Sequence, residues 1–232
     1  MENHASMIMR CDMWKLTQLF IIFRNLAVVF SLMIVLPHGA MAASKPKPLP
    51  DIGIDEGDEL YKRGHYEKAV DWWKDAAQKG SVNAQYRLGA AYNDGVARAK
   101  EVIVPQDFKE AAKWLIQAAE QGDERAQFDL AALYDNGLGV EKSLTEAARW
   151  YLAGAQRGQV ACQYNIAVMY EDGIGVQKDL VEAYKWYYLA AQQGFVEFGG
   201  PALEKLGRQL QPAQVRSAIQ MAKVMKPIPP VR

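Results

Sequence analysis

Histidine and cysteine are scarce in this chain, and their scarcity excludes most catalytic and metal-binding chemistry. The 232 residues include three histidines and two cysteines, and beyond residue 42 only His65 and Cys162 remain. One imidazole and one thiol cannot form a His/Cys zinc site with the usual four ligands, and a lone cysteine cannot form a disulfide within the chain. We therefore predict no catalytic residue, no metal site and no cofactor.

These two residues have ordinary interpretations. His65 falls where a helix is predicted to start, at a position that other repeats fill with Asp or Ser, so a turn residue is favoured over a catalytic base. Cys162 replaces an alanine that other copies of the repeat carry, which favours a small buried side chain. A reactive thiol or an intermolecular bridge is the alternative for Cys162.

Motifs of hydrolases and nucleotide-binding proteins are also missing. The sequence has no Gly-x-Ser-x-Gly and no His-Glu-x-x-His. Gly137–Gly139 and Gly173–Gly175 begin like a dinucleotide loop, but Lys142 and Lys178 stand where the third glycine belongs, and both loops follow predicted helices rather than strands. The 27 basic and 27 acidic residues balance, so no basic excess indicates nucleic acid.

The N-terminus has the features of a bacterial secretory signal. Lys15 and Arg24 precede the apolar run Leu26–Leu36, and Ala40–Ala42 gives the small-x-small pattern of a cleavage site. The run is shorter than the roughly 20 apolar residues that span a bilayer. We predict a signal peptide over residues 1–42, cleaved after Ala42, and a periplasmic or secreted protein with no membrane span after cleavage. An uncleaved signal that anchors the chain in the inner membrane is the alternative.

An internal repeat dominates the rest of the chain. Three segments align with one another, and each is followed by a second block that ends in tryptophan. A glycine closes each unit, and the last two units are 36 residues apart, whereas six extra residues lengthen the first. The first segments are Ala84–Gly95, Ala126–Gly137 and Cys162–Gly173, the second blocks Glu110–Trp114, Glu146–Trp150 and Glu182–Trp186, and the closing glycines Gly122, Gly158 and Gly194.

Each unit reads as a pair of helices. Leu130 and Tyr134 lie four residues apart on one face of the first helix. The second helix begins at Asp107, Ser143 or Asp179, with glutamate three residues later, which is the spacing of a capping box. The recurring tryptophans Trp72, Trp114, Trp150 and Trp186 predict core packing rather than a sugar-binding platform. Small residues such as Gly154-Ala155 predict close helix crossing.

The pattern of alanine, Leu-Gly, tyrosine, Gly-x-Gly-Val, tryptophan and Ala-Ala-x-x-Gly resembles the Sel-one-like repeat, a relative of the tetratricopeptide repeat. The resemblance implies an all-α, right-handed superhelical solenoid of antiparallel helix pairs. The domains then follow in order: signal peptide 1–42, Pro-rich linker 43–52, a tetratricopeptide-like unit 53–81, repeats 82–123 (with the insertion), 124–159 and 160–195, capping helices 196–226, and a frayed tail 227–232.

The resemblance further implies a protein adaptor that presents a concave wall of first helices. The wall register, carried over from tetratricopeptide repeats, predicts partner contacts, although its aromatic positions also suit packing. Within the insertion, three apolar residues must either pack on the solenoid or meet a partner. The predicted partner-binding residues are Tyr86, Ala90, Asn93, Phe128, Ala132, Asp135, Tyr164, Val168 and Glu171 on the wall, and Val102, Ile103 and Val104 in the insertion.

We thus expect a non-enzymatic, monomeric adaptor or regulator that scaffolds or restrains an envelope protein complex, with one or more proteins as partners and no nucleic acid. Two other functions stay open: a receptor for envelope glycan or a small molecule, and an enzyme of cell-wall metabolism. A membrane-tethered assembly factor requires that the signal is not cleaved.

Overall fold

The computed structural model describes residues 54–98 and 101–229, with side chains from residue 56 onward. The predicted signal peptide and linker lie outside the described residues, as do residues 230–232. The helices are α2 (Ile54–Lys62), α3 (Tyr66–Gln78), α4 (Val82–Asp94), α5 (Phe108–Glu120), α6 (Glu124–Asn136), α7 (Leu144–Gln156), α8 (Val160–Asp172), α9 (Leu180–Gln192), α10 (Val196–Gln209) and α11 (Pro212–Val224), and the strands are β1 (Val96–Arg98) and β2 (Glu101–Val104).

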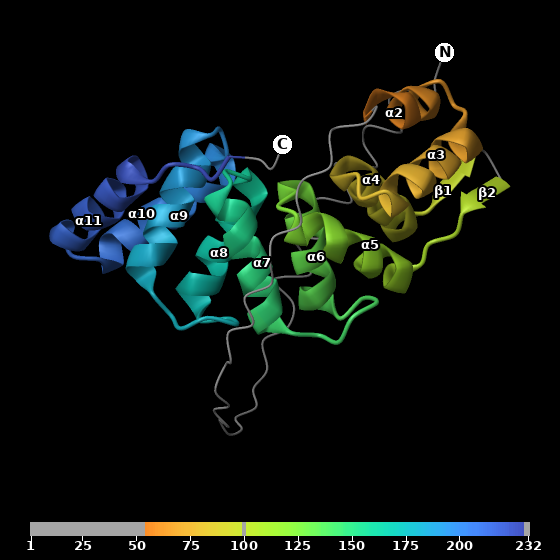
Figure 1. The fold of residues 1–232 in the computed structure, drawn as a ribbon. Coiled ribbons are helices and arrows are strands. Elements are labelled where there is room, and N and C mark those ends of the chain that lie inside the picture. Colours follow the sequence, from red (N-terminus) through yellow and green to blue (C-terminus); the bar gives the residue numbers. More distant parts are fainter. Residues whose placement is uncertain (1–53, 99–100, 230–232) are drawn as a thin grey trace, which may run out of the picture. The chain divides into compact units, whose positions relative to one another are not determined.

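The helices stack in chain order as a helical repeat solenoid (Figure 1). Each helix from α2 to α10 packs on the next, and the first helices α2, α4 and α6 also contact one another along the stack. The predicted helical repeat fold is confirmed. Its core is built from alanines that are fully buried at the helix crossings and from one large aliphatic residue per first helix, namely Leu88, Leu130 and Ile166. Burying each of these aliphatic side chains stabilises the fold by about 1.5–3 kcal/mol.

The capping boxes form only in part. Asp107, Ser143 and Asp179 are the N-caps of α5, α7 and α9, and their side chains accept hydrogen bonds from the main-chain N–H groups of the first turn. The reciprocal bond from the glutamate is replaced. The N–H of each N-cap residue donates instead to a tyrosine carbonyl near the end of the preceding helix, at 2.8–2.9 Å. That carbonyl is one of the four left free at a helix end. These tyrosines are Tyr92, Tyr134 and Tyr170.

The Gly-x-Gly loops are packing elements. Gly137 ends α6 in the left-handed conformation, with φ of 70°. The second glycine, Gly139, lies directly against the carbonyl of Phe108 at the start of α5, with no room for a Cβ, and Gly175 does the same at Leu144. Close contact with the preceding repeat therefore explains the second glycine.

The tryptophans follow the repeat less strictly than predicted. Trp150 and Trp186 are buried, whereas Trp114 and Trp72 are only half-buried. In the first unit it is the neighbouring Trp73 that is buried, with 3% of its surface exposed. The short helix α2 explains the change, because Gly57 of that helix packs directly on the Trp73 ring.

The six-residue insertion forms a β-hairpin rather than a loop. β1 and β2 pair antiparallel, with Val96 opposite Val104 and Arg98 opposite Glu101. Arg98 also forms an ion pair with Glu67 of α3 at 3.1 Å, which ties the hairpin to the first helix pair.

The C-terminal helices α10 and α11 both pack on α9 and cover the last repeat. α10 starts at Val196 and runs through Gly199-Gly200-Pro201, which we expected to precede the helix. Pro201 lies in its second turn and lacks an N–H to donate. Close contact explains why the helix starts early: a Cβ on Gly199 would lie 3.3 Å from the carbonyl oxygen of Tyr187 in α9.

The tail departs from the prediction of a frayed end. The N–H of Ile228 donates to the carbonyl of Gln156 at 2.9 Å, and Arg157 donates to the carbonyl of Pro229 at 2.9 Å. Residues 227–229 are therefore held at the end of α7. Among the described residues, no helix combines the length and apolar character needed to cross a membrane.

Candidate functional site

The surface formed by α2, α4, α6 and α8, here called the first-helix face, carries most of the predicted partner-binding residues. Its aromatic members are half-buried and pack within the protein. Phe128 lies 6.0 Å from Tyr151 of α7, and Tyr164 lies 5.4 Å from Tyr187 and 5.3 Å from Phe195, between ring centroids. These aromatic positions therefore link first helices to second helices.

Glu171 is engaged inside the protein. It is 8% exposed, and its carboxylate accepts hydrogen bonds from Tyr187 at 2.9 Å and from Lys205 at 2.6 Å. Lys205 belongs to α10, so the contact ties the last repeat to the capping helices. Burial and the adjacent Glu171 carboxylate raise the pKa of the Tyr187 hydroxyl, which therefore stays a donor.

The remaining predicted residues of this face are half-buried: Ala90, Asn93, Ala132, Asp135 and Val168. Asn93 donates to the Asp94 carboxylate at 2.8 Å, and its own carbonyl accepts a bond from Gln106. Burial raises the pKa of Asp135, and Lys142 opposes that rise. Small side chains at 90, 132 and 168 leave room beside the polar residues of the same helices.

The three apolar residues of the insertion have different environments in the hairpin. Val104 is 4% exposed and packs in the core around α3 and α4, Ile103 is half-buried, and Val102 is 64% exposed. The hairpin therefore packs on the solenoid through Val104 and presents Val102 to solvent.

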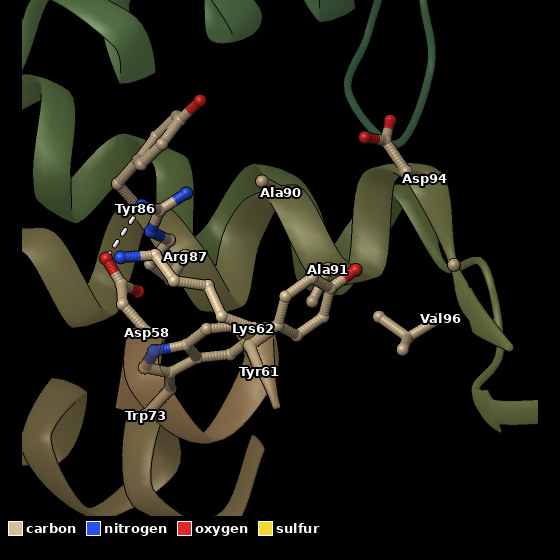
Figure 2. Close-up of a pocket in the computed structure, with 11 residues that line it drawn as sticks. Asp58, Tyr61, Lys62, Trp73, Tyr86, Arg87, Ala90, Ala91, Asp94 and Val96 are labelled. Carbon is tan, nitrogen blue, oxygen red and sulfur yellow. Dashed lines mark hydrogen bonds and ion pairs between the residues drawn. The ribbon is translucent and has the colours of Figure 1, made fainter. Parts of the chain in front are cut away.

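A hollow of about 360 Å³ opens between α2 and α4 (Figure 2). Tyr61, Trp73 and Tyr86 give it aromatic walls. Figure 2 shows Arg87 reaching Asp58 at one end of the hollow and Asp94 at the other. The complete lining is Asp58, Tyr61, Lys62, Trp73, Tyr86, Arg87, Ala90, Ala91, Asp94, Gly95 and Val96.

The two guanidinium groups of this region are already paired. Arg87 binds the Asp58 carboxylate at 2.7 Å. Arg125 binds Asp123 at 2.6 Å, and its guanidinium lies 4.1 Å from the centre of the Tyr86 ring. Both arginines are therefore held by acids of their own chain.

Two carboxylates of the same region have no such partner. Within the described residues, neither Asp94 nor Asp129 forms an ion pair, and Asp129 accepts no hydrogen bond either. Burial raises the pKa of Asp129 to about 7, the charges of Asp94 and Asp123 add to the rise, and Arg125 opposes it. Burial also raises the pKa of Asp94, against the bond from Asn93. A cation placed between these carboxylates would lower both pKa values.

Sequence reasoning missed this pair because it followed the recurring aromatic residues. The polar position lies one residue later in each repeat, at Arg87, Asp129 and Asn165. Residues that recur in every copy make the same packing contact, whereas a position that varies in charge between copies faces solvent or a partner. That variation at a half-buried position was the available signal.

The site offers binding rather than reaction chemistry. In the described part of the chain, no group of three His, Cys, Asp or Glu side chains is placed to hold a metal ion. Its chemical elements are two unpaired carboxylates, one internal Asp–Arg pair and three aromatic rings. Such a set can hold an organic cation with an apolar stem.

Comparison with solved structures gives two relatives of similar fold. A Sel1 repeat protein from Oxalobacter formigenes is 30% identical, with a TM-score of 0.58, over 71% of this chain and 65% of that protein. A protective antigen present in uropathogenic Escherichia coli strains, which displays an SLR fold, is 24% identical over 73% of this chain and 44% of that protein, with a TM-score of 0.52. The second likeness concerns the fold alone.

The match therefore spans less than two thirds of either relative. A comparison with curated protein sequences gave no match. A sequence model of the Sel1 repeat matches residues 56–81, 82–123, 124–159 and 160–195, which together make up more than half of the chain. The chain belongs to the Sel1 repeat family.

Proposed function

We propose that this protein is an exported adaptor, periplasmic or secreted, that binds a protein partner on its first-helix face and scaffolds or restrains an envelope complex. Sel1 repeats generally mediate protein–protein interaction, and their proteins are generally scaffolds without enzymatic activity. The signal predicted over residues 1–42 supports export. The rigid stack of helix pairs supports binding, because its surface is preorganised.

The observation that carries the proposal is the unpaired carboxylate pair, Asp94 and Asp129. A half-buried carboxylate has lost part of its hydration, and without a cation nothing offsets that loss. A lysine or arginine of a partner would restore the lost interaction and gain from the low local dielectric. The partner that fits best therefore presents a basic side chain to α4 and α6.

The hollow beside Asp94 supports the same partner. Long basic side chains bury their methylene stems on apolar surface while the charged end stays near polar groups. The rings of Tyr61 and Tyr86 line the hollow, and aromatic faces attract cations. A basic side chain flanked by an apolar one would thus fill the hollow and reach the carboxylate.

The test is an affinity capture of the chain from residue 43 to 232 out of envelope extract, with mass spectrometry of the bound proteins. The Asp94→Asn/Asp129→Asn variant should lose a stoichiometric partner. The matched control is Asp71→Asn/Glu120→Gln, which removes two exposed acids of the second helices α3 and α5. Thermal melting should show that both variants fold. Equal capture by the two variants would contradict the proposed site.

Export has its own test. Cell fractionation followed by N-terminal sequencing should give a periplasmic or secreted chain that begins at Ala43. An intact N-terminus in the membrane fraction would favour the anchored form instead.

A receptor for a glycan or a small molecule is the second candidate, favoured by the aromatic lining of the hollow. Saccharide titration followed by tryptophan fluorescence tests it, because Trp73 lines the hollow. A saturable signal that disappears with Trp73→Phe would support the receptor. No saturable signal would leave the adaptor as the better assignment.

A further inference from the structure

The C-terminal tail occupies a defined place at the end of α7. The carbonyl of Gln156 lies in the last turn of the helix, where no helical N–H is available, and it accepts the N–H of Ile228 at 2.9 Å. Arg157 donates to the carbonyl of Pro229 at 2.9 Å, and Pro227 faces Gly158. The site therefore reads one N–H and one C=O of an extended segment.

This site is particular to one repeat. The residue before the closing glycine is Lys79, Gln121, Arg157 or Gln193 in the four units, so only the α7 turn carries arginine. Arginine offers several N–H donors in a planar group that suits a carbonyl oxygen at a fixed position. The described tail is seated at the turn that has this residue.

The segment seated there has a counterpart elsewhere in the chain. The tail reads Lys226-Pro227-Ile228-Pro229, and the N-terminal linker reads Lys47-Pro48-Leu49-Pro50. In both, a branched aliphatic residue between two prolines keeps the only main-chain N–H between them, which is the group that Gln156 accepts. Prolines also restrict such a segment to an extended conformation, so little entropy is lost on docking.

The linker of the same chain is too short to reach this site. Pro50 precedes the start of α2 by four residues, which span at most about 14 Å. α2 packs on α3 and α4, whereas α7 packs on α6 and α8. The steps from α2 through α4 and α6 to α7, at about 8–10 Å for each packed helix pair, sum to more than that span. An occupant from the linker must come from another copy.

We propose that the end of α7 is a docking site for Lys-Pro-aliphatic-Pro segments, filled by the tail of the same chain and, when the tail is released, by the Lys47–Pro50 segment of a second copy. The tail has the advantage of its tether, which gives it an effective concentration of about millimolar. The intact chain is therefore monomeric at micromolar concentration. Release of the tail permits head-to-tail association, which is a property beyond the adaptor function.

The test uses the chain from residue 43 to 232 with Ile228→Pro. This substitution removes the donated N–H and changes a side chain that is 45% exposed, so the fold is kept. The peptide acetyl-Lys-Pro-Leu-Pro-amide is titrated into ¹⁵N-labelled protein. We expect shifts of the Gln156, Arg157 and Gly158 amides, and binding at least about fivefold tighter than to the unsubstituted chain, because the tail no longer competes.

Two controls make the result specific. Adding Arg157→Gln to the Ile228→Pro chain should weaken peptide binding, whereas Arg149→Gln, an exposed change on the same helix, should not. The peptide acetyl-Lys-Ala-Leu-Ala-amide should bind more weakly than its proline counterpart. Equal binding of the two peptides, no effect of Arg157→Gln, or no shift up to about 10 mM peptide would each overturn the proposal.

Self-association is measured by sedimentation velocity over a concentration series. The Ile228→Pro chain should sediment faster as its concentration rises. Adding Leu49→Pro, which removes the corresponding N–H of the linker, should abolish that rise. A concentration dependence that survives Leu49→Pro would show that another surface associates and would overturn the assigned occupant.

Discussion

The sulfur of Cys162 fills the space that a side chain on Gly154 would need. A Cβ placed on Gly154 in α7 would lie 2.5 Å from the Cys162 Sγ in α8, and Cys162 is fully buried. The corresponding pairs in the two preceding repeats are both alanine with alanine. The larger residue on one helix thus stands opposite the smaller residue on the other, which keeps the crossing close. These pairs are Ala76 with Ala84 and Ala118 with Ala126.

We expect a double-mutant cycle at this pair to be strongly non-additive. Gly154→Ala alone should overpack the crossing and destabilise the fold by about 1–3 kcal/mol. Cys162→Ala alone should leave a small void and cost about 1 kcal/mol. The double variant reproduces the alanine pair of the other repeats and should recover most of the Gly154→Ala loss. Urea denaturation measures the three free energies of unfolding. Additive losses would contradict compensation.

Asp129 should make stability fall as pH rises. Its folded pKa is about 7, above the value of about 3.9 for an unfolded chain. Between these values the folded carboxyl keeps its proton while the unfolded one releases it, so the free energy of unfolding decreases with pH. Below about pH 4 both states are protonated, and above about pH 7 the loss is constant.

Asp129→Asn keeps the shape and removes the charge, so it should stabilise the protein at pH 8 and change little at pH 4. The full shift corresponds to about 4 kcal/mol, and solvent screening of this half-buried group reduces the expected gain to about 1–3 kcal/mol. Denaturation at both pH values measures it. Asp172→Asn, an exposed change at the end of α8, is the control. Equal effects of Asp129→Asn at the two pH values would refute the buried-charge interpretation.

The two kinds of closing glycine should differ sharply. Gly139 has a φ of 70° and lies against the Phe108 carbonyl, whereas Gly194 has a φ of 97° and no atom within 4 Å of the position that a Cβ would take. Gly194→Ala should therefore cost only backbone strain, about 1–2 kcal/mol. Gly139→Ala should cost more, since the loop must also move away from α5. Melting temperatures of the two variants provide the comparison, and equal shifts would argue against the close contact.

The repeat predicted the fold because each local signal agreed with the next. Asp107, Ser143 and Asp179 cap helices as their spacing indicated, and the close crossing at Gly154 follows from its small size. The glutamate half of the capping box failed because the N-cap N–H found a nearer acceptor, such as Tyr134 for Ser143, in the preceding helix. That acceptor depends on how the two helices meet, which one helix sequence does not encode.

The candidate site was less predictable for a similar reason. The wall register followed the aromatic residues, and their rings turned out to pack on second helices, as Phe128 does on Tyr151. The unpaired state of Asp129 depends on where Arg125 and Arg87 find their own partners, which is tertiary information. The seated tail likewise depends on a contact between residues far apart in sequence, Ile228 and Gln156.

The hairpin separates a structural valine from an exposed one, and the two should respond differently to charge. Val104→Asp places a carboxylate in a position that is 4% exposed, so it should destabilise the protein by about 3 kcal/mol or more. Val102→Asp changes a side chain that is 64% exposed and should leave the free energy of unfolding within about 0.5 kcal/mol. Urea denaturation compares them. Because Val102→Asp folds normally, loss of a captured partner with this variant would assign the hairpin to the binding surface, and retained capture would restrict binding to the first-helix face.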